Sequence, residues 1–224
     1  MKTQGCIIVA IHGLVMISPI YAQGSNASIG VGVSEQQSIY KDVDDKTGLL
    51  PILSYEGEHF FFQGLTAGYK IMPANSPSNI VVKIKYDLQS FDPKDSTDAQ
   101  LRQLNKRDGA VMGGVSYQIN TPVGLFQTGV LTDISDEHNG TSAELLWTMP
   151  ATYQGWNINT TVGYVYSNSK LNNYYYGVSA AESAVSGLPA YDLDWNGYYI
   201  VSIQSFRMVT SNIAIGGGIN SYPL

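Results

Sequence analysis

Cysteine is almost absent from this 224-residue sequence, whose single cysteine is Cys6. One cysteine excludes a disulfide framework. Charged residues are also scarce, at 13% of the chain, and the formal net charge of −6 argues against a nucleic-acid partner. Helix-forming patterns are nearly missing too, since the best of them, 96–108, is short and polar and predicts at most a helical turn in a loop. The abundant residues, 23 glycines and 16 tyrosines, favour a β-rich protein.

The N-terminal residues 1–22 have the order of a secretory signal peptide. Lys2 is followed by a mostly apolar stretch, 6–20, and then by the small residue Ala22. We expect cleavage after Ala22, which leaves 23–224 as one domain because no linker or change of composition divides it. The alternative is a cytosolic protein with an apolar N-terminal strand. No later run approaches the roughly 18 apolar residues that a transmembrane helix needs.

Alternation of apolar and polar residues is the main structural signal. In the segment 79–91, even-numbered positions from Ile80 to Leu88 are apolar, whereas Lys83, Lys85 and Asp87 share the opposite face. Several other segments repeat this pattern and predict strands. The predicted strands are 26–34, 49–56, 59–71, 79–91, 109–119, 123–133, 141–149, 155–167, 195–208 and 212–220. In 59–71 the alternation is interrupted, and a bulge near Gly64 would restore its phase.

Long and short connections alternate after residue 92, which is typical of an up-and-down antiparallel barrel of the outer membrane. In such a barrel the apolar faces meet lipid, and Lys83, Lys85 and Asp87 line a polar interior. A soluble lipocalin-like barrel would reverse the two faces, and alternation alone does not separate these alternatives. The signal peptide and aromatic residues near strand ends favour the membrane. These aromatic residues are Tyr55, Phe60, Tyr69, Phe91, Trp147, Trp156, Tyr166, Trp195 and Tyr198.

Clusters of potential metal ligands have ordinary explanations. Asp133, Asp136, Glu137 and His138 lie close together, but their spacing matches no standard ligand set, so we interpret them as a solvated acidic loop. We therefore predict no metal and no cofactor.

The sequence also contains the residue types needed for nucleophilic catalysis by a serine. Ser183 or Ser186 would need His59 or His138 nearby, as in an outer-membrane hydrolase, but no G-x-S-x-G motif is present. We predict that the protein is not an enzyme.

One segment carries a family signature. "NNYYYGVSAAESAVSGLPAYD", residues 172–192 and here called the motif loop, resembles the tyrosine-tyrosine-glycine-valine segment of the MltA-interacting protein family, also called MipA/OmpV. "LPILSYEGEHFFFQGLTAGYKI" is similar to that family's proline-x-x-x-tyrosine-glutamate-glycine segment. The matching motif-loop positions are Tyr175, Tyr176, Gly177, Val178, Glu182, Ser183, Ser186, Gly187, Leu188 and Tyr191.

The resemblance implies a non-catalytic outer-membrane protein. The best-described members of this family are scaffolds that tether a lytic transglycosylase to a bifunctional penicillin-binding protein, in contact with outer-membrane lipid. The motif loop would then be a candidate interaction site, or a folded plug without a partner. The alternative function is that of a small porin or surface adhesin.

The resemblance also bears on the number of strands, which we expect to be about 10–12 in the intact barrel. Related proteins have one further strand after the position of Leu224, so we expect the C-terminal strand to be missing here. Ten strands and one missing strand make eleven, whereas single-chain bacterial barrels have even numbers. Either one strand is miscounted, for which we expect 35–56 to be the place, or two strands are missing.

Overall fold

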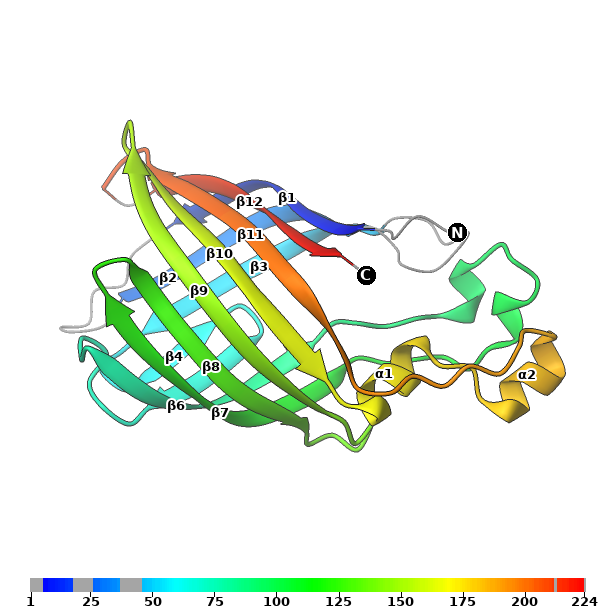
Figure 1. Cartoon of the computed structure of the whole chain (residues 1–224). Coiled ribbons are helices and arrows are strands. Elements are labelled where there is room, and N and C mark those ends of the chain that lie inside the picture. Colours follow the sequence, from blue (N-terminus) through cyan, green and yellow to red (C-terminus); the bar gives the residue numbers. More distant parts are fainter. Residues whose placement is uncertain (1–5, 18–25, 37–45, 212, 224) are drawn as a thin grey trace.

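The computed structural model describes residues 6–17, 26–36, 46–211 and 213–223 (Figure 1). Strands dominate it, and each pairs with its neighbours in antiparallel fashion. The strands are β1 (Cys6–Ile17), β2 (Asn26–Gln36), β3 (Lys46–Glu56), β4 (Phe60–Gln63), β5 (Thr66–Lys70), β6 (Ser78–Asp87), β7 (Ala110–Thr121), β8 (Gly124–Asp133), β9 (Thr141–Tyr153), β10 (Trp156–Ser167), β11 (Asn196–Met208) and β12 (Ile213–Pro223).

Consecutive strands are neighbours throughout, and β1 pairs with both β2 and β12, so the twelve strands form a closed barrel. The predicted up-and-down barrel of about 10–12 strands is confirmed. The strand β1 falls within the residues predicted to be a signal peptide. Ala22, after which cleavage is expected, lies outside the described residues, so removal of the signal peptide stays a prediction.

The structure has two strands more than the ten predicted, because β1 lies in the predicted signal peptide and the stretch 59–71 contains two strands. Residues 59–71 form two short strands, β4 and β5, and not one strand with a bulge. The chain reverses at Gly64, whose φ of 59° is a left-handed conformation that glycine adopts easily. The prediction that the miscount lies within 35–56 is therefore wrong for the part of this stretch that the structure describes. There, Lys46–Glu56 is a single strand.

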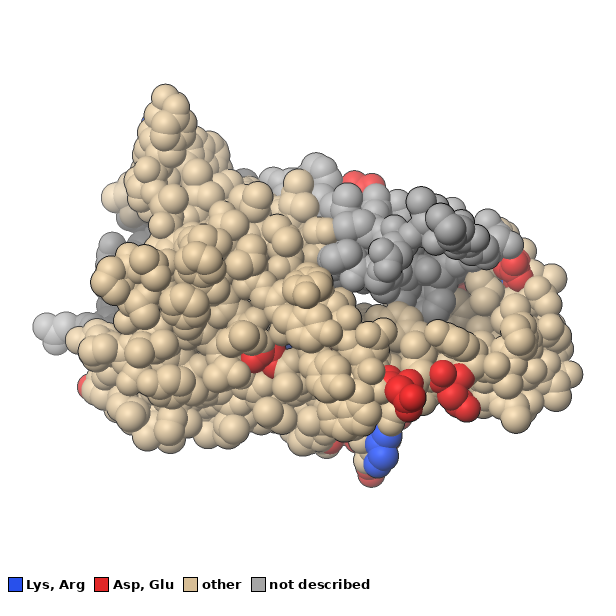
Figure 2. Space-filling view, in the orientation of Figure 1, with Lys and Arg blue, Asp and Glu red and all other residues tan. Residues whose placement is uncertain are grey.

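The two faces of the barrel wall have opposite character. On β6, Ile80, Val82 and Ile84 are 44%, 47% and 51% exposed, whereas Val81, between the first two, is 3% exposed. Figure 2 shows that the strand surface on its visible face is almost free of charged side chains, most of which lie toward one end. Apolar side chains thus point outward, as a barrel in lipid requires.

Most of the predicted strand-end aromatic residues lie on this outer face, where Trp195 stacks on Tyr166 with ring centroids 5.3 Å apart. Two do not. Phe91 is buried in a loop, at 3% exposure, and Tyr198 pairs with the buried Val165 on the inner face.

The two ends of the barrel also differ. At one, the turn end, β7 joins β8 and β9 joins β10 through tight turns, 122–123 and 154–155. At the other, the loop end, long segments carry 3-10 turns (Pro93–Asp95 and Leu101–Gln103) and the helices α1 (Ser169–Tyr176) and α2 (Ala180–Ser186), on the right of Figure 1. The turn within 96–108 confirms the prediction there, but α1 and α2 were not predicted. Among the described residues, neither helix has the length and apolar character needed to span a bilayer.

Candidate functional site at the loop end

A buried ion pair lies at the loop end, where the segment 88–109 meets α2. Arg107 extends from this segment, held by two backbone hydrogen bonds to Phe91 of 2.8 and 2.9 Å. Its Nη2 donates to Glu182 Oε1 at 2.6 Å, and the two side chains are only 8% and 5% exposed. An ion pair this buried persists only when both partners have further hydrogen bonds.

Arg107 has these additional partners. Its Nη1 donates to the carbonyl of Asn105 at 2.6 Å, its Nε donates to the carbonyl of Tyr174, and Nη2 also reaches the carbonyl of Gly177 at 3.5 Å. The guanidinium therefore ties the segment 88–109 to the C-terminal end of α1. Further hydrogen bonds between the same two loops include those from Gln100 to Ser186 and from Asn105 to Glu182.

Glu182 is equally well satisfied, because it closes a capping box at the start of α2. Ser179 accepts from the Glu182 backbone N–H at 3.2 Å, and Glu182 Oε2 accepts from the Ser179 backbone N–H at 3.0 Å. Burial raises the pKa of Glu182, but hydrogen bonds from the backbone of Asn105 and Ser179 and from the guanidinium of Arg107 outweigh it and lower the pKa to about 2. The carboxylate is thus ionised at any physiological pH.

Helix α1 covers part of the barrel mouth. Tyr175 is 2% exposed and Leu171 is 8% exposed, and both pack in one cluster with Ala110, Met112 and Leu131. The last three belong to the inner faces of β7 and β8, so α1 lies over the interior and not over the lipid-facing wall. Tyr175 also donates its hydroxyl to the carbonyl of Asp108 at 3.3 Å.

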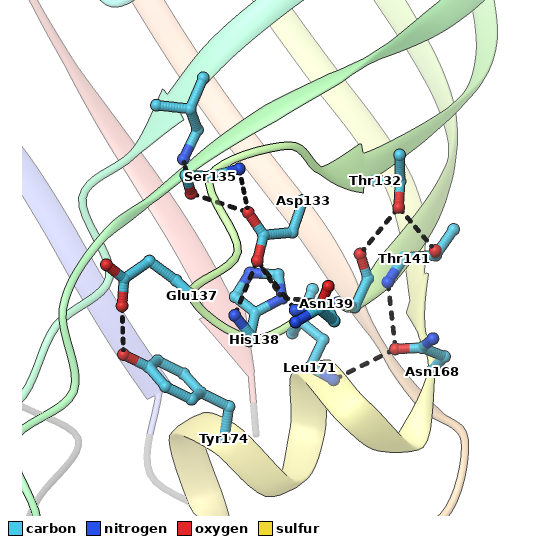
Figure 3. A network of polar contacts seen from close by, with 12 residues as sticks. Thr132, Asp133, Ser135, Glu137, His138, Asn139, Thr141, Asn168, Leu171 and Tyr174 are labelled. Atoms are coloured by element: carbon cyan, nitrogen blue, oxygen red, sulfur yellow. Dashed lines mark hydrogen bonds and ion pairs between the residues drawn. The ribbon is translucent and has the colours of Figure 1, made fainter.

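A second polar network supports α1 from the β8–β9 loop (Figure 3). Asp133 accepts four hydrogen bonds, from the backbone and hydroxyl of Ser135 and from the backbone of His138 and Asn139, at 2.7–2.8 Å. His138 Nδ1 accepts from Gly140, which leaves the proton of the neutral ring on Nε2. Burial lowers the pKa of His138, although the charges of Asp133, Asp87 and Glu137 oppose this shift. The ring lies beside Tyr174 and Tyr175, with centroids 5.6 and 5.7 Å away.

The motif-loop residues divide into buried and exposed sets. Tyr175, Gly177 and Glu182 are buried, whereas Gly187 and Tyr191 are exposed and Tyr176, Val178 and Ser183 are half-buried. Val178 and Tyr191 exchange two backbone hydrogen bonds of 2.9 Å, which close the loop around α2. The segment is therefore compactly folded, and most of its matched residues contact their own chain.

The three charged residues of β6 that were predicted to line the interior lie along one face of this strand. Lys83 Nζ is 2.5 Å from Glu144 Oε1 of β9, which also accepts from Gln127 Nε2 at 2.9 Å. Since β7 and β8 separate β6 from β9 in the wall, these side chains meet across the interior. Asp87 Oδ1 accepts from the Gln89 backbone N–H at 3.1 Å, and Lys85 is exposed.

The residues considered for a hydrolase are not brought together. Ser183 Oγ donates to the carbonyl of Leu188 at 2.6 Å, and Ser186 Oγ accepts from the backbone of Leu188 at 3.2 Å. His59 lies near the other end of the barrel, where its Nδ1 is 2.8 Å from the carbonyl of Lys70. Over the described ranges, neither histidine bonds to either serine, and no group of three potential metal ligands converges.

Sequence reasoning missed Arg107 and the helical nature of the motif loop. A signal for α2 was present, since Ser179 and Glu182 have the serine-x-x-glutamate spacing of a capping box. No local signal marked Arg107, because its partner lies 75 residues away.

Comparison with known proteins agrees with this architecture. The sequence profile described as MltA-interacting protein MipA matches residues 29–221. The chain belongs to this family. It is 33% identical to the MltA-interacting protein of Escherichia coli (strain K12) over 177 residues, which is 78% of this chain and 71% of the relative.

Two further relatives of this MipA-family chain are named for their location. The putative outer membrane protein YiaT of Escherichia coli O157:H7 is 30% identical over 184 residues, covering 82% of this chain and 74% of the relative. The 24 kDa outer membrane protein of Pasteurella multocida (strain Pm70) is 24% identical over 207 residues, covering 88% and 79%. The chain is therefore an outer-membrane barrel of the MipA family, and the resemblance seen in the sequence is confirmed. The family is named for an interaction and not for a reaction.

Proposed function

We propose that the protein is a non-catalytic outer-membrane scaffold that binds a lytic transglycosylase of the MltA type and holds it beside a bifunctional penicillin-binding protein. The observation that carries this proposal is the 33% identity, over most of both chains, with a protein named for its interaction with MltA. A barrel fixed in the membrane would act by raising the local concentration of its partners, to the order of mM for a short tether.

The partner surface is proposed to be the turn end. Short turns of outer-membrane barrels face the periplasm, where the cell-wall enzymes act, and long loops face outward. The strand β2, the first after the predicted cleavage site, also begins at the turn end, because Asn26 pairs with Glu56 beside the 57–59 turn. Exposed apolar residues are available there, including Val123 and Tyr153, which are 61% and 65% exposed.

The motif loop is proposed to act as an internal cap, since it lies at the opposite end. Its buried residues contact the barrel mouth through Tyr175 and the segment 88–109 through Glu182. This arrangement agrees with a plug that stabilises the barrel and leaves the periplasmic end free for partners.

A co-purification experiment tests both assignments. Full-length protein extracted in mild detergent is expected to retain the transglycosylase, with loss of binding in a Val123→Glu, Tyr153→Ala variant and normal binding in Tyr191→Ala. Recovery of neither enzyme by the unaltered protein contradicts the scaffold. Loss of binding in Tyr191→Ala alone would place the partner on the motif loop.

The porin alternative is addressed by conductance in a planar bilayer. Because α1 packs over the inner faces of β7 and β8, we expect at most a small, infrequent conductance from the unaltered protein. A large, steady conductance would favour a pore over the scaffold.

A further inference from the structure

Although neighbouring strands close into a barrel, the described residues leave its wall incomplete between β3 and β6 at the loop end. The strand β4 has four residues and pairs only with Ser54–Glu56 of the eleven-residue β3. The strand β5 pairs with Val81–Lys85 of β6. Both hairpin strands fall short of the roughly 9–11 residues that cross a bilayer. Above the hairpin tip at Gly64–Leu65 a lateral notch therefore remains, bordered by Thr47–Leu53 on β3 and by Tyr86 on β6.

Hydrogen bonding defines where the notch begins. Gly64 donates to the carbonyl of Leu53 at 3.0 Å, and Tyr86 donates to the carbonyl of Leu65 at 2.9 Å. Alternate residues of a strand direct their backbone groups to the same side, so Thr47, Leu49 and Pro51 face the notch as Leu53 does. Within the described residues, none of these three has a backbone partner on that side.

Pro51 indicates that this edge is not built to receive another strand. Proline lacks an N–H and is confined to strand edges. The register of β2 with β3 runs without a bulge through Val31 and Pro51, so the missing N–H of Pro51 points into the notch. Unpaired backbone at membrane depth is tolerated where it lines a polar cavity, and the notch opens onto the interior that holds Lys83 and Glu144.

The outer rim of the notch is apolar. Leu49 is 78% exposed, Leu65 at the hairpin tip is 46% exposed, and on the β6 side Tyr86 and Leu88 are 42% and 55% exposed. Both sides of the opening therefore present apolar side chains to the surroundings of the barrel.

The interior side carries Lys85, a cation for which the described part of the chain supplies no ionic partner. Lys85 pairs in register with Thr66, the first residue after the hairpin tip, and with Met112, whose side chain lies in the interior cluster. Although Lys85 faces inward it is exposed, as is Gln63 next to it at the tip, whereas Lys83 is 11% exposed and bound to Glu144. Among the described residues Lys85 forms neither an ion pair nor a side-chain hydrogen bond, and the nearby Asp87 has one oxygen bound to the Gln89 backbone.

From this juxtaposition we propose that the notch is a lateral binding site for a single-chain amphiphile with an anionic headgroup, such as a fatty-acid carboxylate or a lysophospholipid phosphate. The acyl chain lies against Leu49, Leu65 and Leu88, and the headgroup passes through the wall to the ammonium of Lys85. A strand partner is disfavoured, because Pro51 lacks a donor and no strand of the described residues pairs with β3 above the hairpin. The proposal is independent of any enzyme partner.

Binding of cis-parinaric acid to the full-length protein in phosphatidylcholine nanodiscs tests this site. We expect saturable binding with one site, weakened by roughly tenfold or more in Lys85→Gln, since a charge-assisted hydrogen bond is lost. The matched control is Lys106→Gln, which removes a lysine that is exposed outside the wall and paired with Asp108. Equal loss in both variants, or no saturable binding in the unaltered protein, overturns the proposal.

A second variant tests the route through the wall. Gly48 faces the interior at the edge of the notch, and a Cβ added there meets no atom within 4 Å. Gly48→Trp is expected to fill the opening and reduce binding about as much as Lys85→Gln, with heat-modifiable gel migration confirming that both variants fold. Unchanged binding in Gly48→Trp would show that the ligand does not enter through the notch and would overturn the proposal.

Competition identifies the headgroup. We expect lysophosphatidylglycerol and stearate to displace the probe, and an uncharged monoacylglycerol not to displace it. The anion that displaces the probe at the lower concentration shows whether the site prefers a phosphate or a carboxylate headgroup. Equal displacement by the uncharged lipid contradicts the role of Lys85. A benzophenone amino acid at Leu49 is expected to cross-link lipid, and a protein adduct in its place would contradict a lipid ligand.

Discussion

Arg107 Nη2 lies 2.6 Å from Glu182 Oε1 although the two residues are 75 positions apart in the chain. This contact joins the segment 88–109 to α2 and, together with the packing of Tyr175, holds the motif loop on the barrel mouth. Removing one partner of a buried ion pair leaves the other charge without compensation.

We therefore expect Glu182→Gln to reduce the free energy of opening the motif loop by about 3 kcal/mol. The barrel should remain intact, because the strands do not depend on α2. Limited proteolysis is the measurement, with faster cleavage within 168–195 as the expected result. Glu58→Gln, at an exposed position of the turn end, is the control, and equal protease sensitivity in both variants would contradict the assignment.

Acid should weaken the same contact at a defined pH. The folded pKa of Glu182, about 2, is below its ordinary value of 4.5. The contribution of its ionisation to stability is therefore fully present above pH 4.5 and is lost as the pH falls toward 2. Pepsin cleavage of the motif loop between pH 4.5 and 2 is expected to rise steeply in the unaltered protein and to be less dependent on pH in Glu182→Gln. Parallel pH profiles would exclude Glu182 as the titrating group.

His138 predicts a second pH dependence, in a different range. Its folded pKa lies below 6.5 because the ring is buried. Protons then bind the opened loop more readily than the closed one, so the β8–β9 loop is most stable above pH 6.5 and loses stability as the pH falls below it. Amide exchange of residues 134–140, corrected for the intrinsic rate, should accelerate from pH 7.5 to 5.5. In His138→Gln the corrected rates at the two pH values should agree, and an unchanged acceleration would point to another group.

The orientation of the wall is tested at two consecutive positions of β11. Ile203 is outward and 51% exposed, whereas Gln204 faces the interior opposite Gly218. Ile203→Arg places a charge in lipid and is expected to reduce the free energy of unfolding by about 2–4 kcal/mol, whereas Gln204→Arg should have little effect. Urea unfolding in lipid vesicles measures both. A larger loss in Gln204→Arg would mean that the faces are reversed.

The turn that divides β4 from β5 should depend on the backbone freedom of Gly64. Gly64→Ala is expected to lower the free energy of unfolding by about 1 kcal/mol. The left-handed φ is the only cause, because a Cβ added at this position meets no atom within 4 Å. Gly48→Ala is the matched control, since the space around Gly48 is equally open but its φ is not left-handed. Thermal unfolding of the two variants gives the difference, and equal stabilities would contradict the assigned turn.

The sequence by itself determined that the chain forms strands with two unlike faces, because alternation with period two is a local property of an extended chain. It showed that Ile80, Val82 and Ile84 share one face, but it did not decide between a membrane barrel and a soluble barrel with reversed faces. The outward exposure of these residues in the structure decided it. Only the tertiary structure decided the contacts between distant segments. These contacts include the ion pair of Arg107 with Glu182 and the packing of α1 over the barrel interior. They also include the hairpin formed by 59–71, which leaves Pro51 at an unpaired strand edge. These outcomes depend on loop lengths and on which buried charges can be paired, and such information is spread over the whole chain and not carried by any one segment.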